Sequence, residues 1–136
     1  MSTMQNQDLL HALLDSWDRS NTILLNLLRV LPDGGLEARA MEGSPSVSEM
    51  LTHLHHERMV SVFEEAAEFA GHLPEQEWVA ERDPERIARM LNESARVVRA
   101  AVQGRVEAGR GLDLNFDHPL LLIQFLIFHE PTTTAR

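Results

Sequence analysis

The segment from Asp117 to Arg136 reads DHPLLLIQFLIFHEPTTTAR, and its secondary structure decides the fold class. An apolar run interrupted only by Gln124 leads to His129, after which a polar tail begins at Pro131. A short apolar run is compatible with a buried strand or a buried helix. Because no other segment has the pattern of a partner strand, we predict a helix. Since this helix is apolar all round, we expect it to be buried on every side.

Three longer segments upstream have the periodicity of amphipathic helices. Apolar residues recur at steps of three and four from about Asp8 to Leu31, from about Val47 to Gly71, and in a third helix that begins at Asp83-Pro84 and ends near Gly109. Ser46 followed three residues later by Glu49 is a capping-box pattern, which marks the start of the second helix.

Four such helices predict an all-α four-helix bundle. Pro131 disfavours a helical Glu130, so we expect a shortened fourth helix of about three turns. With 136 residues the chain has room for one domain, covering residues 1–136.

The composition excludes several classes of function. The net charge is −9 with only 12 Lys and Arg residues and no basic cluster, which argues against nucleic-acid binding and against anionic membranes. No segment has the ~20 apolar residues of a membrane span. The absence of cysteine removes disulfides, thiolate nucleophiles and cysteine-based zinc sites. Since no signal peptide is visible either, we expect a soluble, cytoplasmic protein.

Two histidine positions are candidate metal ligands. In HLHHE, which spans His53 to Glu57, the first and last residues are four apart and therefore face the same side of a helix. The alternative is the polar flank of a surface helix. His129 ends a buried helix, so we expect its imidazole to project into the interior or a cleft, where it needs a hydrogen bond or a metal. The alternative here is a capped histidine at a frayed helix end.

Three other histidines have simpler explanations. His11 lies on the polar side of the first helix, His72 is in a loop, and His118 immediately precedes the proline that starts the fourth helix. We expect none of the three to bind metal.

The segments EMLTHLHHE and LLLIQFLIFHE, in the second and fourth helices, resemble the DinB-like family of four-helix bundles. This family includes bacillithiol and mycothiol S-transferases and proteins described as metal-dependent hydrolases. The resemblance implies a divalent metal, zinc or nickel, held by three histidines. The first corresponds to His53 and the second to His129. It also implies a homodimer and a small-molecule or low-molecular-weight thiol substrate.

The chain departs from the family pattern at the third ligand. The His-x-x-x-His of the fourth helix would place a histidine at position 133, which is Thr133, and the Gly-Gln that usually follows is absent. Glu57, His56 or water would have to complete the ligand shell. We therefore expect metal binding and activity to be weak or lost.

The unusual tail has two possible origins. The codons GAG GCC TAC CAC TAC GGC CAG G encode Glu-Ala-Tyr-His-Tyr-Gly-Gln, and deletion of one G after the first codon yields the observed Glu130–Arg136. A frameshift is therefore compatible with the tail, and natural divergence is the alternative.

Two classes of function remain open. One is a metal-dependent enzyme of the thiol S-transferase or hydrolase type, and the other is a non-catalytic helical-bundle protein for interaction or dimerisation. The residue that the gene encodes at position 133 discriminates between them, because histidine in the gene favours the enzyme and threonine favours the interaction protein.

Overall fold

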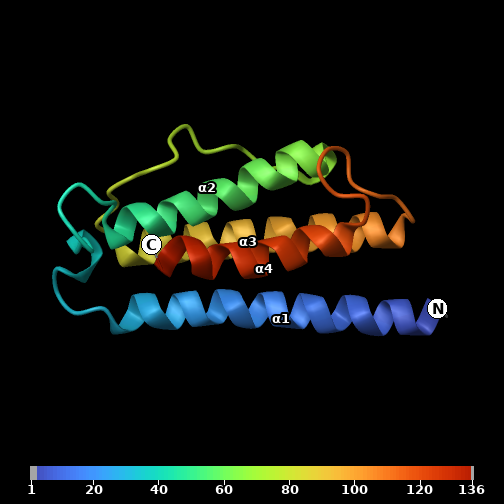
Figure 1. Ribbon diagram of the computed structural model, residues 1–136, viewed down its shortest axis with the longest axis horizontal. Coiled ribbons are helices and arrows are strands. Elements are labelled where there is room, and N and C mark those ends of the chain that lie inside the picture. The colour runs from blue at the N-terminus through green and yellow to red at the C-terminus, as the bar shows by residue number, and fades with distance from the viewer. Residues whose placement is uncertain (1–2, 136) are drawn as a thin grey trace.

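The computed structural model describes the backbone of residues 3–135 and the side chains of residues 7–129. Within these residues, the chain forms a four-helix bundle with two additional 3-10 turns, η1 and η2 (Figure 1). The elements are α1 (Thr3–Val30), η1 (Gly35–Glu37), α2 (Val47–Glu65), η2 (Ala67–Phe69), α3 (Pro84–Glu107) and α4 (Pro119–Ala135). The predicted all-α four-helix bundle is confirmed. No helix among the described residues is long and apolar enough to cross a membrane.

The starts of α2 and α3 follow from the capping signals in the sequence. The Ser46 side chain accepts a hydrogen bond from the Glu49 N–H at 3.1 Å, while the Glu49 carboxylate accepts one from the Ser46 N–H at 3.0 Å. The Asp83 carboxylate accepts from the Glu85 N–H at 3.0 Å, and Pro84 takes the first helical position. These bonds satisfy donors that have no partner inside the helix, so both helices begin where the sequence predicts.

The helix α2 ends earlier than predicted. It stops at Glu65 instead of Gly71, because Ala66 leaves the helical conformation at φ −154° and ψ 66° and the chain continues as η2. This turn brings Phe69 against α3, where a Cβ at Gly104 would collide with the Phe69 ring. The missing side chain at Gly104 therefore permits the close approach that periodicity alone could not reveal.

The helix α4 is the shortest of the four described helices, with 17 residues against 28, 19 and 24 in α1, α2 and α3. The expectation that it ends near Glu130 is wrong, because the helical backbone continues through Pro131 to Ala135. Proline disfavours a helical conformation for the residue before it but does not forbid one. The prediction of a shortened fourth helix is confirmed, but its predicted end is not.

The expectation that α4 is buried on every side is also wrong. Leu122, Ile123 and Leu126 are buried, whereas Phe125 and Phe128 are 43% and 71% exposed. A helix in a four-helix bundle packs against its neighbours along one side and leaves the other side open, even when both sides are apolar.

The core consists of two apolar clusters separated by a polar layer. Trp17, Val62 and Val98 belong to one cluster, and Leu54 and Leu91 belong to the other. In the layer between them, Arg58 of α2 donates hydrogen bonds to the side chains of Asn21 on α1 and Ser94 on α3. Arg58 is fully buried, and its guanidinium also lies 4.7 Å from the centre of the Trp17 ring.

The chain order makes α2 and α3 parallel neighbours. In Figure 1, α2 and α3 run in the same direction, while α1 and α4 run in the opposite one. The connector, residues 66–83, must therefore return along the length of α2 before α3 can begin, as the yellow-green trace shows (Figure 1). This return path places the connector beside the histidines of α2.

Candidate metal centre

The first predicted ligand, His53, is buried on α2 with only 8% of its surface exposed. Its Nε2 lies 3.2 Å from Oε1 of Glu57, one helical turn further along. The prediction that these two side chains face the same side of the helix is confirmed. His53 is thus not on the polar flank of a surface helix, which was the alternative interpretation.

The second predicted ligand, His129, reaches the same oxygen from α4. Its Nε2 lies 3.2 Å from Oε1 of Glu57 in a hydrogen bond, and its ring stacks on Phe125 at 5.0 Å between centroids. The imidazoles of His53 and His129 therefore converge on one carboxylate oxygen, although the two residues are far apart in the sequence.

Two residues of the connector, which were not among the predicted site residues, complete the surroundings of His53. Oε1 of Glu77 lies 3.0 Å from Nδ1 of His53. The ring of Trp78 stacks on the His53 ring with 4.0 Å between centroids and an angle of 6° between the planes. His53 is thus contacted by α2 on one nitrogen and by the connector on the other.

Hydrogen bonding at this cluster is incomplete among the described residues. Nδ1 of His53 and Oε2 of Glu57 are buried and form no hydrogen bond there, although Oε1 of Glu77 lies 3.0 Å from Nδ1. No group of three or more His, Asp or Glu side chains in the described part of the chain is arranged to hold a metal ion. The Thr133 side chain, at the position of the third family ligand, lies outside the described side chains.

A cavity of about 230 Å³ opens beside His129 and Glu57. Its walls also include His56, Glu64 and Glu77. The cavity therefore gives small molecules a route to His129 and to the Glu57 carboxylate that both imidazoles approach.

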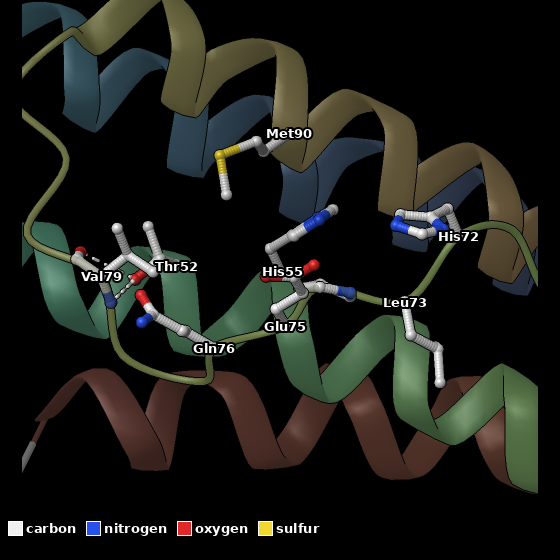
Figure 2. A pocket seen from close by; sticks show the side chains of 9 residues that line it. Thr52, His55, His72, Leu73, Glu75, Gln76, Val79 and Met90 are labelled. Carbon is white, nitrogen blue, oxygen red and sulfur yellow. Dashed lines mark hydrogen bonds between the residues drawn. The ribbon is translucent and has the colours of Figure 1, made fainter.

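A second, larger cavity of about 460 Å³ lies between α2, α3 and the connector, and His53 is not among the residues that line it (Figure 2). His55, His72 and Met90 line it. His55 is 5% exposed, and burial lowers its pKa despite opposing contributions from the Glu93 charge and a hydrogen bond to the Met90 backbone. This buried histidine was not among the predicted site residues, because HLHHE contains three neighbouring histidines and does not indicate which side of α2 is covered.

The remaining histidines occupy the expected positions. His11 is exposed on α1, and His72 is exposed in the connector. Nδ1 of His118 accepts a hydrogen bond from the Leu120 N–H at 3.1 Å at the start of α4, so the prediction that a helix start explains it is confirmed.

Comparisons with protein-family models, curated proteins and solved structures found no match to this chain, so its function has to be argued from the geometry of the site.

Proposed function

We propose that this chain is a DinB-like protein with a partial divalent-metal site, in which His53 and His129 are the ligands and Glu57 is the nearest further donor. The observation that carries the proposal is the approach of both Nε2 atoms to Oε1 of Glu57, at 3.2 Å each. Imidazole nitrogen and carboxylate oxygen are donors that zinc and similar divalent ions accept.

The distances support a shared ion. Donors bound to one tetrahedral zinc ion at about 2.0–2.2 Å stand roughly 3.3–3.6 Å apart. The two nitrogen–oxygen distances of 3.2 Å are just below this range. A small outward movement of the Glu57 carboxylate, which has 26% of its side chain exposed, would make room for the ion. The ion could also be coordinated by the buried Oε2 of Glu57, which has no hydrogen-bond partner among the described residues.

The chemistry of such a site follows from its open positions. A divalent ion with few protein ligands can bind a thiol as thiolate or lower the pKa of a bound water, which serves thiol transfer and hydrolysis alike. His53, His129 and Glu57 would hold the ion, and the adjoining cavity would admit a small thiol or other small substrate. With threonine at position 133, we expect weak metal binding and little activity.

Calorimetric titration with zinc and with nickel tests this proposal. We expect weak, saturable binding that disappears in His53→Ala and in His129→Ala. His11→Ala is the matched control, because it removes an exposed imidazole far from the site, and it should bind like the unmodified protein. Binding that survives both site variants would refute the site, and tight stoichiometric binding would refute the expected weakness.

A homodimer is a second candidate function, and a specific surface supports it. α1 and α4 are in contact with each other. Both expose large apolar side chains near the end of the bundle at which their C-termini lie: Ile23 at 66%, Leu27 at 51%, Val30 at 75%, Phe125 at 43% and Phe128 at 71%. Exposed apolar side chains on two helices that contact each other favour association, so this set of side chains, named here the α1/α4 face, is the proposed dimer interface. An interaction protein of this kind would need no metal.

A further inference from the structure

The connector is fastened to α2 immediately beside His53. The Thr52 hydroxyl accepts a hydrogen bond from the Val79 N–H at 2.9 Å and lies 3.0 Å from the Val79 carbonyl oxygen. One turn earlier, the Ser48 hydroxyl donates to the Glu81 carbonyl at 2.6 Å. Figure 2 shows the Thr52–Val79 bonds as dashed lines. The two anchors lie on α2, so the connector backbone is held against the helix that carries His53.

This anchoring fixes the two residues that precede Val79. Trp78 lies parallel to the His53 ring at 4.0 Å, and Glu77 places Oε1 3.0 Å from Nδ1. Neither residue belongs to the apolar core, since Trp78 is 42% exposed and the Glu77 side chain is 46% exposed. Burial of apolar surface therefore explains only part of why Trp78 and Glu77 lie where they do. Contact with His53 is the feature that the two residues share.

The two contacts have separate chemical effects on the imidazole. A carboxylate next to Nδ1 favours the tautomer with hydrogen on that nitrogen, which leaves the lone pair on Nε2. Nε2 is the atom that faces Glu57, and the Glu57 carboxylate favours hydrogen on Nε2, so the two carboxylates act on the tautomer in opposite directions. The stacked indole limits rotation of the ring about its bond to Cβ. Together, the Glu77 carboxylate and the Trp78 ring favour one orientation of the His53 ring and the tautomer with a lone pair on Nε2.

We propose that Glu77 and Trp78 are positioning residues that hold His53 as a metal ligand, with Glu77 fixing the tautomer and Trp78 fixing the plane of the ring. This inference rests on the proposed metal site. The proposal adds two residues of the connector to the site. In the contacts described above, both residues touch His53 and neither touches Glu57 or His129. Outer carboxylates that orient ligating histidines raise metal affinity by about 10–100-fold in other sites.

The first test measures metal affinity by calorimetric titration with zinc. Glu77→Ala and Trp78→Ala should each weaken binding by about 10–100-fold. Glu77→Gln, which retains an acceptor oxygen, and Trp78→Phe, which retains an aromatic ring, should recover part of the loss. Glu75→Ala is the matched control, because it removes the same charge from the same connector at the wall of the other cavity. It should bind zinc as the unmodified protein does.

A second test reads the His53 tautomer without any metal. Two-bond ¹H–¹⁵N correlation spectra of the metal-free protein, at a pH where the ring is neutral, report which nitrogen of His53 carries the hydrogen. Nδ1 should carry it in a larger fraction of the unmodified protein than of Glu77→Ala, in which only the Glu57 carboxylate at Nε2 remains beside the ring. Glu75→Ala should leave the tautomer unchanged. A purely structural role for Glu77 would alter stability without altering the tautomer.

The outcomes separate this inference from the proposed function. If the unmodified protein binds zinc and Glu77→Ala binds it equally well, the positioning role is overturned and the metal site stands. If the unmodified protein binds no metal, the proposed function fails. The tautomer of His53 in Glu77→Ala and in Glu75→Ala then still decides whether Glu77 positions the ring. An unchanged tautomer in Glu77→Ala would overturn the inference in that case also.

Discussion

Arg58 is a cationic side chain at the centre of the molecule, with no exposed surface. Its guanidinium donates hydrogen bonds to Oδ1 of Asn21 at 3.0 Å and to the Leu91 carbonyl at 2.9 Å, and it lies over the ring of Trp17. A buried charge is tolerated only when such partners replace water. Arg58 therefore ties α1, α2 and α3 together at one level of the bundle.

Replacing Arg58 with methionine measures how much the hydrogen bonds of this buried layer contribute to the free energy of unfolding. The substitution keeps a long side chain but leaves the oxygens of Asn21 and Leu91 without their charged donor, so we expect a loss of about 3 kcal/mol in the free energy of unfolding. Urea denaturation followed by circular dichroism measures it. Arg99→Met is the control, because Arg99 pairs with Asp18 at the surface and should cost less than about 1 kcal/mol. Equal losses in both variants would contradict a special role for the buried layer.

A second arginine, Arg105, organises an ion-pair cluster near the start of α4. Its Nε and Nη2 donate to the two carboxylate oxygens of Glu68 at 2.6 and 2.9 Å, and Nη2 also donates to Asp113 at 3.0 Å. The side-chain hydrogen bond from Arg105 is the main cause that lowers the pKa of Glu68 from 4.5 to about 2. The pKa of Asp113 is lowered by the same guanidinium.

The lowered pKa of Glu68 predicts a pH-dependent contribution to stability. The contribution is fully present above pH 4.5, where Glu68 is ionised in both states, and it is lost as the pH falls toward 2, because the unfolded state takes up the proton first. Glu68→Gln should therefore be less stable than the unmodified protein in urea at pH 6, and the difference should narrow at pH 3. Glu42→Gln, in the loop before α2, is the control. A difference that does not depend on pH would contradict this assignment.

At the scale of single elements, the capping signals were the most informative part of the sequence. Ser46 with Glu49 and Asp83 with Pro84 marked the starts of α2 and α3 correctly, because caps act through neighbouring residues. The end of α2 was missed, because the fit of Phe69 against Gly104 joins segments distant in sequence. Periodicity also does not separate the buried apolar residues of α1 from the exposed ones, since Leu9 and Leu27 are 44% and 51% exposed.

The length of α4 changes what can be expected of position 133. The helical backbone continues to Ala135, so residues 129 and 133 lie one turn apart on the same side of α4. We predict that Thr133→His supplies the absent imidazole and strengthens zinc binding by at least tenfold, which calorimetric titration measures. Thr132→His is the control, because it adds the same imidazole about 100° away around the helix. An equal gain in both variants would mean that any added histidine suffices.

At the scale of the whole molecule, the sequence predicted four helices but not their directions. Periodicity identifies which residues are apolar, whereas the parallel arrangement of α2 and α3 depends on how the faces of all four helices pack (Figure 1). The same limit applies to the site. His53 and His129 were predicted as neighbours from the family resemblance, and they do approach the same carboxylate oxygen. Glu77 and Trp78 were missed, because only the return path of the connector brings them to His53.

The association state is the last property that belongs to the whole molecule. If the α1/α4 face is a dimer interface, sedimentation equilibrium should give a dimer that dissociates on dilution. The double variant Ile23→Glu, Leu27→Glu should be monomeric and still helical, because both side chains are more than half exposed and their replacement leaves the core intact. Met41→Glu, at a 70% exposed position in the loop before α2, should remain dimeric.

This experiment also separates the two candidate functions. The double variant changes only Ile23 and Leu27, which lie on α1. The proposed metal ligands lie on α2 and α4. His53→Ala should therefore remain a dimer while losing metal, and the monomeric Ile23→Glu, Leu27→Glu variant should retain weak metal binding. A chain that is monomeric at every concentration would refute the dimer and leave the metal site as the surviving proposal. A dimer that binds no metal would instead favour the interaction protein.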